Sequence, residues 1–173
     1  MIGVRMTNIT FKGNPVTLSG TPPTVGEKAP EFHVHKNPGE SLALSSASGK
    51  RILLTTAPSV DTGVCAAQLR TFEARLAEAG DDADFELWFV TRDLPFALDR
   101  FAEQAGIRHV KTLSDYKDRV LGESFGLVID ELGLLARTVF VIDKDGTVLY
   151  RELVPEIATE PDYDDAWAIV TGA

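Results

Sequence analysis

The feature that most constrains the fold is a buried strand that runs through a short loop into an amphipathic helix. The stretch Arg51 to Thr56 is short and rich in aliphatic and β-branched residues, as is typical of a buried strand. After it, four side chains recur at the spacing of one helical face: Cys65, Leu69, Phe72 and Leu76. A strand followed at once by a helix favours a layered α/β architecture, in which the helix covers one face of a sheet.

Strands and helices alternate along the rest of the chain. Four further stretches have the character of strands: Phe32 to His35, Phe85 to Val90, Arg137 to Ile142 and Thr147 to Leu153. The helical patterns are one capped by Asp93 and stopped by Gly106, a short one around Asp115 to Ser124, and a closing one from Asp162 to Val170. A hairpin strand pair with helices on both faces of a mixed sheet is the thioredoxin-like arrangement. We therefore expect an α/β thioredoxin-like fold, with residues 1–173 forming a single domain.

An N-terminal β-hairpin precedes this alternation. The stretches Asn8 to Lys12 and Pro15 to Leu18 flank Gly13 and Asn14, two residue types that favour turns. The segment Thr21 to Glu27 contains two prolines and is typical of a connector. The sequence therefore predicts a hairpin over about residues 8–18, joined to the main unit by this connector.

Cys65, the only cysteine in the chain, is a candidate nucleophile because it lies in the first turn of the predicted helix. There it faces unpaired backbone N–H groups and the positive end of the helix dipole, both of which favour thiolate over thiol. Asp61 and Thr62 are residue types that cap a helix, and Pro58 fixes the chain as it leaves the strand. From spacing alone an alternative stays open, since a lone cysteine on an apolar helical face is usually a small buried hydrophobe.

The residues around Cys65 resemble the active-site pattern of peroxiredoxins. Pro58, Thr62 and Cys65 match Pro-x-x-x-Thr-x-x-Cys, and the run between them is similar to that of the bacterial thiol peroxidase group. Three other segments resemble the same group, in the same order: Phe11 to Leu18, Asp93 to Ala97, and Thr159 to Tyr163. The similarity spans nearly the whole chain and implies the fold and activity of that family.

The resemblance implies a role for each residue of the expected site. The Cys65 thiolate would attack a peroxide oxygen and become a sulfenic acid. The Thr62 hydroxyl and the backbone N–H groups of Val64 and Cys65 would donate hydrogen bonds there, while Pro58 would shield the site from water. The family also has an arginine at the start of a late buried strand, where this chain has Arg137, whose cation would favour thiolate and orient the peroxide. Without the resemblance, Arg137 is better explained as a surface charge at the edge of a strand.

One position departs from the family pattern. Many thiol peroxidases carry a resolving cysteine in an Arg-Phe-Cys tripeptide, whereas this chain has Arg100, Phe101 and Ala102. With Cys65 alone no intramolecular disulfide can form, so a thiol from elsewhere must recycle the sulfenic acid. Three explanations stay open: a natural one-cysteine enzyme served by thioredoxin or a small thiol, a dimer bridged through Cys65, or an engineered cysteine-to-alanine replacement.

Composition and charge limit the classes of binding partner and the cellular location that we expect. The formal net charge of -9 argues against nucleic-acid binding, which depends on clustered lysine and arginine. No apolar run approaches the roughly twenty residues that span a bilayer, and Met1 to Thr7 lack the apolar core of a secretory signal. We therefore expect a cytoplasmic protein without a membrane partner, in a compartment that keeps thiols reduced. The resemblance adds a peroxide substrate, thioredoxin or a low-molecular-weight thiol as reductant, and a homodimer.

Other candidate sites are weaker. His33 and His35 share a strand face, but no third ligand of suitable spacing accompanies them. The acidic loop of Asp81, Asp82 and Asp84 lacks the spacing of a calcium loop. The chain has neither a glycine-rich phosphate cradle nor a G-x-S-x-G elbow. We therefore expect no metal, no cofactor and no serine hydrolase chemistry.

The leading hypothesis is a thiol peroxidase that reduces hydrogen peroxide and alkyl hydroperoxides through Cys65. One alternative is a redox sensor or binding module of the same fold, in which oxidation of Cys65 changes a partner contact without efficient turnover. A further alternative is a structural thioredoxin-like domain with an inert cysteine.

Overall fold

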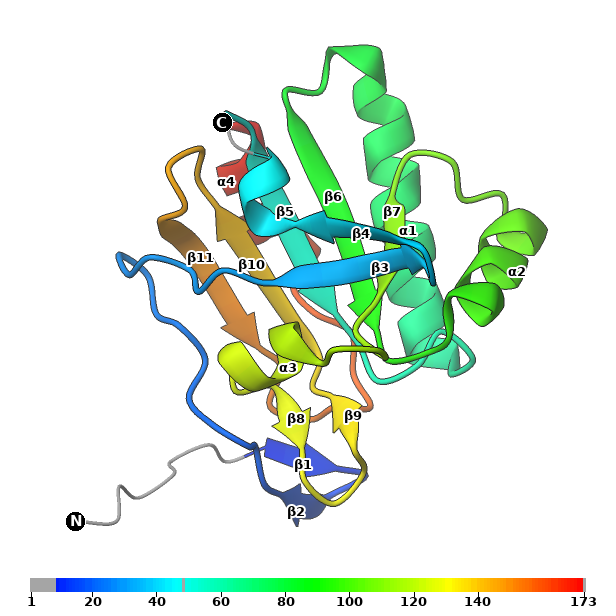
Figure 1. Cartoon of the computed structure of the whole chain (residues 1–173), viewed down its shortest axis with the longest axis vertical. Helices are drawn as coiled ribbons and strands as arrows, with labels where there is room; N and C mark the ends of the chain where they lie inside the picture. Colours follow the sequence, from blue (N-terminus) through cyan, green and yellow to red (C-terminus); the bar gives the residue numbers. More distant parts are fainter. Residues whose placement is uncertain (1–8, 48, 173) are drawn as a thin grey trace.

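The computed structural model describes residues 9–47 and 49–172. Its centre is a seven-stranded mixed sheet in the order β11-β10-β5-β6-β7-β3-β4 (Figure 1). The strands are β3 (His33–Asn37), β4 (Glu40–Ala43), β5 (Arg51–Thr56), β6 (Phe85–Thr91), β7 (Lys111–Ser114), β10 (Thr138–Ile142) and β11 (Val148–Leu153). Strands β5, β6 and β7 run parallel, whereas the other neighbours are antiparallel. Both the predicted mixed sheet and its closing strand pair are therefore present.

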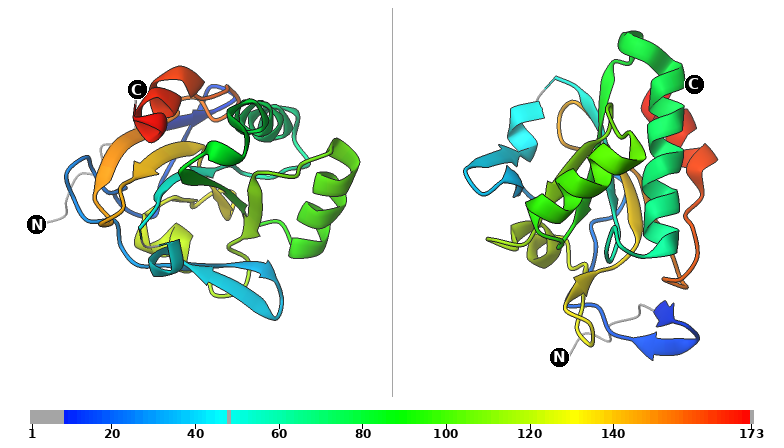
Figure 2. Two further views of the ribbon diagram at one scale, coloured as in Figure 1. Left: turned by 90° about the horizontal axis from the view of Figure 1, so that it is seen from above. Right: turned by 90° about the vertical axis from the view of Figure 1, so that its right-hand side faces the viewer.

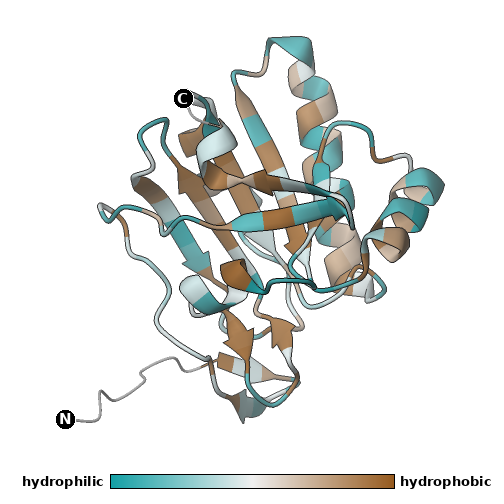
Figure 3. Cartoon of the chain, viewed as in Figure 1, coloured by the Kyte–Doolittle hydropathy of each residue, from teal (hydrophilic) through white to brown (hydrophobic). Residues whose placement is uncertain are grey.

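Helices cover both faces of this sheet (Figure 2). Helices α1 (Gly63–Ala79) and α4 (Tyr163–Thr171) lie on one face, and α3 (Val120–Ser124) lies on the other with the short 3-10 helix η1 (Leu44–Ala47). Helix α2 (Pro95–Ala105) packs beside β7, and the 3-10 turn η2 (Gly80–Asp82) follows α1. The sequence of β5 explains this layering, because Leu53 packs on the α1 side while Ile52 and Leu54 pack on the opposite side. Figure 3 shows how hydrophobic the central strands are.

Helix α1 buries the face that the sequence periodicity marks. Cys65, Leu69 and Phe72 are fully buried, and Leu76 is nearly so. Full burial of each large apolar side chain stabilises the fold by about 1.5–3 kcal/mol. The helix ends at Gly80, whose φ of 70° lies in the range that favours glycine. This packing fixes the direction of the helix and therefore the position of its first turn against the sheet.

The predicted N-terminal hairpin is present, with one correction to its turn. Strands β1 (Ile9–Phe11) and β2 (Asn14–Val16) pair antiparallel, and Asn14 faces Phe11 across the ladder. The turn is therefore Lys12-Gly13 and not Gly13-Asn14, because both of its residues have the positive φ, 51° and 81°, of a tight hairpin turn. Residues 1–8, which include the predicted first hairpin residue, lie outside the described ranges.

The hairpin is held against the segment that follows β11. The backbone N–H of Thr10 donates to the Pro155 carbonyl at 2.8 Å, and that of Ile157 donates to the Thr10 carbonyl at 2.9 Å. The Glu156 carboxylate accepts from the Gly13 N–H at 2.8 Å and from the Thr10 hydroxyl at 3.1 Å. The hairpin is thus attached through both backbone and side-chain bonds to residues near the other end of the chain.

Two predicted helix starts are wrong, and an extra strand pair is present. Asp93 does not cap α2, because the cap position is Leu94 and Pro95 is the first helical residue. Helix α3 begins at Val120 and not near Asp115, because Arg119 takes a left-handed φ of 59°. The Asp115 carboxylate accepts from two N–H groups of α3, each at 3.0 Å. The strands β4 and β7 of the central sheet were not predicted, and neither were the short strands β8 (Val128–Ile129) and β9 (Leu134–Leu135).

The predicted closing helix is present. Asp162 caps α4, and its carboxylate accepts from the N–H groups of Asp164 and Asp165. None of the helices that the structure describes has both the length and the apolar character needed to cross a bilayer.

Candidate active site

Cys65 lies in the first turn of α1, close to the end of β5 and the start of β10. Its side chain has 0% of its surface exposed. The first helical hydrogen bond runs from the Ala66 N–H to the Thr62 carbonyl at 3.0 Å, so the amides of Val64 and Cys65 precede the helical ladder. The burial agrees with the predicted apolar face, and the end of the helix places partial positive charge beside the sulfur.

Arg137 is the charged partner of this sulfur. It directly precedes β10 and is only 2% exposed. Its Nη1 donates to Cys65 Sγ at 3.3 Å and to Gln68 Oε1 at 2.7 Å. Its Nε and Nη2 both donate to the Ile157 carbonyl, at 2.9 and 2.8 Å. The interpretation of Arg137 as an exposed surface charge is therefore wrong.

Among the residues that the structure describes, the guanidinium of Arg137 lies beside the sulfur without a carboxylate partner. No Asp or Glu side chain in the described ranges forms an ion pair with this guanidinium. A buried cation without an anionic partner carries a desolvation penalty of several kcal/mol. A thiolate at Cys65 supplies the missing anion at hydrogen-bonding distance, whereas a neutral thiol does not.

Gln68 is a site residue that the sequence interpretation missed. It is fully buried, and its Oε1 accepts from Arg137 while its Nε2 donates to Thr55 Oγ1 at 2.5 Å and to the Thr56 carbonyl at 3.3 Å. Thr55 Oγ1 in turn donates to the Thr138 carbonyl at 2.9 Å. This network joins α1, β5 and β10 around Arg137. The available signal was a glutamine three residues after Cys65, on the otherwise apolar helical face.

Pro58 and Thr62 lie in the loop between β5 and α1. Pro58 is buried, whereas Thr62 is exposed. The Thr62 hydroxyl donates to the Ser59 carbonyl at 2.9 Å, and no side chain caps the start of α1. Thr62 is thus the N-cap residue of α1, as its residue type predicts, but its side chain bonds to Ser59 and not to the helix. The structure brings Cys65 and Arg137 into direct contact, while Thr62 is held through its bond to Ser59.

The other predicted candidates lie apart from this site. His33 Nε2 lies 2.7 Å from Asp118 Oδ2, and His35 Nε2 lies 3.8 Å from the same oxygen. Within residues 9–47 and 49–172, no group of three or more His, Cys, Asp or Glu side chains has a metal-binding arrangement. Asp81 and Asp82 lie in η2. Ala102 is half-buried on α2, at the position where the family pattern has a second cysteine.

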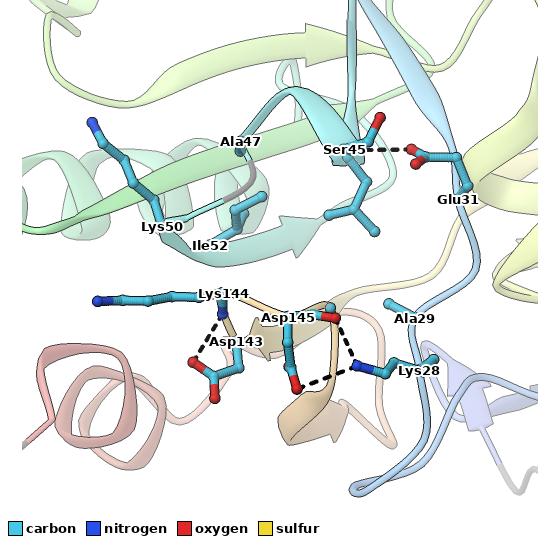
Figure 4. Close-up of a pocket in the computed structure, with 12 residues that line it drawn as sticks. Lys28, Ala29, Glu31, Ser45, Ala47, Lys50, Ile52, Asp143, Lys144 and Asp145 are labelled. Atoms are coloured by element: carbon cyan, nitrogen blue, oxygen red, sulfur yellow. Dashed lines mark hydrogen bonds and ion pairs between the residues drawn. The ribbon is translucent and has the colours of Figure 1, made fainter.

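A surface pocket of about 310 Å³ lies elsewhere, between the chain around Lys28, the η1 segment and the turn after β10 (Figure 4). Its rim carries charges of both signs, and the Lys28 ammonium pairs with the Asp145 carboxylate at 3.2 Å. Neither Cys65 nor Arg137 lines this pocket. It is therefore separate from the thiol site.

Comparisons with known proteins identify the family to which the chain belongs. A family model described as Redoxin matches residues 24–167. The thiol peroxidase of Bacillus subtilis is 46% identical over 159 residues, which cover 92% of this chain and 93% of the relative. The thiol peroxidase of Halalkalibacterium halodurans is 46% identical over 161 residues, which cover 93% and 95%.

A solved structure confirms the predicted fold. The peroxiredoxin-like protein from Aquifex aeolicus superposes with a TM-score of 0.87 and 38% sequence identity, over 95% of both chains. The sequence match and the shared fold therefore lead to one conclusion: this chain belongs to the Redoxin family and, within it, to the thiol peroxidases.

Proposed function

We propose that Cys65 is the residue with which this thiol peroxidase reduces hydrogen peroxide and alkyl hydroperoxides. The observation that carries the proposal is the 3.3 Å bond from Arg137 Nη1 to Cys65 Sγ inside a fully buried site. The thiolate is the reactive form of cysteine, and this arrangement favours it through one buried cation and one helix terminus.

The reaction is a displacement on oxygen. The Cys65 thiolate attacks the peroxide oxygen that carries the hydrogen, a sulfur–oxygen bond forms, and the oxygen–oxygen bond breaks. That hydrogen stays with the new sulfenic acid, and the departing oxygen takes a proton from solvent and leaves as water or an alcohol. Negative charge moves from sulfur to the departing oxygen, so donors already fixed around both atoms lower the barrier.

The chain offers such donors from several directions. Arg137 already donates to the sulfur, and its position is fixed by the Ile157 carbonyl and by Gln68. The N–H groups of Val64 and Cys65 lie at the helix terminus, where they would meet a bound peroxide. We assign Pro58 the role of a buried shield against water, and the Thr62 hydroxyl that of a donor once it leaves Ser59.

Recycling needs a thiol from outside the described chain, because Cys65 is the only cysteine. We propose thioredoxin or a low-molecular-weight thiol as this reductant. Since the sulfur is fully buried, the residues that cover it must move before a reductant can reach it. We also propose a homodimer and a cytoplasmic location, the latter because that compartment keeps thiols reduced.

A stepwise redox experiment tests this function. Reduced protein is mixed with one equivalent of hydrogen peroxide, the mass of the Cys65 peptide is followed over time, and thioredoxin or a small thiol is then added. We expect conversion to sulfenic acid faster than for a free thiol, followed by repeated turnover with reductant. Oxidation without turnover would favour a redox sensor, and oxidation at the rate of a free thiol would favour an inert cysteine. The matched Cys65→Ser variant should consume no peroxide.

A further inference from the structure

Asp93, which does not cap its own helix, instead binds the loop that carries the site. Its Oδ1 accepts from the Ser59 hydroxyl at 2.7 Å, and its Oδ2 accepts from the backbone N–H of Val60 at 2.7 Å. A third donor, the Thr91 hydroxyl, lies 2.7 Å from Oδ2. Three short bonds to one carboxylate are charge-assisted and therefore stronger than neutral ones. Asp93 thus joins the end of β6 to the loop between β5 and α1.

A continuous series of hydrogen bonds leads from Asp93 to the turn that holds the sulfur. Ser59, bound by Asp93 through its hydroxyl, accepts at its carbonyl from the Thr62 N–H at 3.1 Å and the Thr62 hydroxyl at 2.9 Å. The Thr62 carbonyl then accepts from the Ala66 N–H at 3.0 Å, the first bond of α1. Cys65 lies inside this turn. Three successive hydrogen bonds therefore connect the Asp93 carboxylate to the first turn of α1, so a shift of the carboxylate can move that turn.

The other side of Asp93 is fixed to the sheet. Its backbone N–H donates to Thr91 Oγ1 at 3.1 Å, and its carbonyl accepts from the Ser114 hydroxyl. The Asp115 N–H donates to the Thr91 carbonyl at 2.8 Å, which joins the ends of β6 and β7. The backbone of Asp93 is therefore held by the ends of two neighbouring parallel strands, while the loop that its carboxylate binds has no regular structure of its own.

We propose that Asp93 is a positioning residue for the peroxidase reaction, acting through Ser59 and Val60 to fix the loop that presents Cys65. This proposal rests on the proposed role of Cys65. Asp93 contacts neither the sulfur nor Arg137 in any bond of the structure, so its effect is on geometry. Misplacing a reacting group by about 1 Å can slow a reaction about 100-fold. We therefore expect loss of the carboxylate to slow oxidation of Cys65 by peroxide by roughly 10- to 100-fold.

The test compares two carboxylates on the intact chain, half-buried Asp93 and buried Glu73. Asp93→Asn removes the negative charge and replaces one of the two acceptor oxygens by an NH2 group, so Ser59 and Val60 can no longer both donate to separate oxygens. Glu73→Gln, the same chemical change at another carboxylate, is the matched control. Glu73 lies on α1, about two turns after Cys65, and its carboxylate accepts from the backbone N–H groups of residues 108–110. For each variant we would measure the melting temperature, the single-turnover rate of Cys65 oxidation by hydrogen peroxide, and the rate of Cys65 alkylation by iodoacetamide.

We expect a lower melting temperature for both variants, but slower oxidation of Cys65 by hydrogen peroxide only in Asp93→Asn. Its alkylation rate should stay the same or rise, because a looser loop exposes the sulfur. Ser59→Ala, which leaves the Val60 bond in place, should give an intermediate loss. A peroxide rate within twofold of wild type in Asp93→Asn would overturn the proposal, as would equal losses in both carboxylate variants. If Cys65→Ser still consumes peroxide, the assignment of Cys65 itself fails, which is a separate result.

Discussion

Replacing Arg137 by methionine removes the buried cation while keeping a long apolar side chain. The change deletes the Nη1 bond to Cys65 Sγ and the bonds to Gln68 Oε1 and the Ile157 carbonyl. A hydrogen bond to a charged group contributes about 1.5–3 kcal/mol, and each 1.36 kcal/mol is a factor of ten in rate. If this energy is lost from the reacting thiolate, oxidation of Cys65 at neutral pH slows by about 10- to 150-fold.

The same structure predicts the effect on stability. Arg137→Met leaves the buried acceptors of Gln68 and Ile157 without this donor, and an unsatisfied buried acceptor costs about 1–3 kcal/mol. The variant should therefore unfold at lower denaturant concentration than wild type while remaining folded under assay conditions. Arg137→Lys is the matched variant, because it keeps the charge and loses the planar fork.

The assay is a rapid mix with hydrogen peroxide, followed by trapping of the Cys65 sulfenic acid with dimedone and mass spectrometry. A second measurement, the rate of Cys65 alkylation by iodoacetamide at neutral pH, reports the reactivity of the thiol. We expect the larger loss of both rates in Arg137→Met and a smaller loss in Arg137→Lys, which keeps the charge. Rates of peroxide oxidation and alkylation in Arg137→Met that match wild type would refute the reasoning and leave Arg137 with a purely structural role.

Three further predictions concern stability and recycling. Burial raises the pKa of Glu73, but hydrogen bonds from the loop after α2 outweigh it, and the net pKa is lowered. The stabilisation by the Glu73 carboxylate is therefore complete above the ordinary glutamate pKa and is lost as the pH falls through the lowered pKa of the folded protein. The denaturation midpoints of wild type and Glu73→Gln should then converge in acid, and a difference that stays constant with pH would contradict this. Gly126 has a φ of 65°, and a Cβ there would lie 2.5 Å from the backbone carbonyl carbon of Gly20. Gly126→Ala should therefore cost about 2–5 kcal/mol. Gly133→Ala, with a φ of 67° and open space, should cost about 1–2 kcal/mol by the same urea melts, and equal losses would exclude the clash. Ala102→Cys should form a disulfide with Cys65 after peroxide treatment, visible by non-reducing peptide mapping; an unbridged oxidised product would mean that α1 and α2 do not bring the two thiols together.

Much of the fold could be predicted because the informative patterns are local. The bounds of β5 and the buried face of α1 follow from apolar spacing, which is set by packing against a sheet on one side. The turn of the N-terminal hairpin could not be placed in this way. Lys12 adopts a positive φ of 51°, and nothing in a lysine side chain marks that conformation in advance.

The candidate site was predictable only in part, because its polar partners come from distant segments. Spacing alone did not bring Arg137 to Cys65; the family resemblance suggested it, and the structure places the two in contact. Asp93 precedes a helix and so has the local pattern of a cap, but its carboxylate binds Ser59, 34 positions earlier in the chain. Local sequence does not distinguish a carboxylate that binds its own helix from one that binds another loop.

The hydrogen bonds that attach the N-terminal hairpin also connect it to the residues around Cys65. Thr10 exchanges backbone bonds with the segment 155–157, and the carbonyl of Ile157 in that segment receives two bonds from Arg137. A purification tag or a deletion that displaces this hairpin therefore disturbs the carbonyl that fixes the Arg137 guanidinium. Protein preparations that differ only at the amino terminus should be compared by their rate constants for peroxide reduction as well as by their yield. For the same reason, a substitution in the hairpin can shift the carbonyl that holds Arg137 without altering any residue that contacts the sulfur.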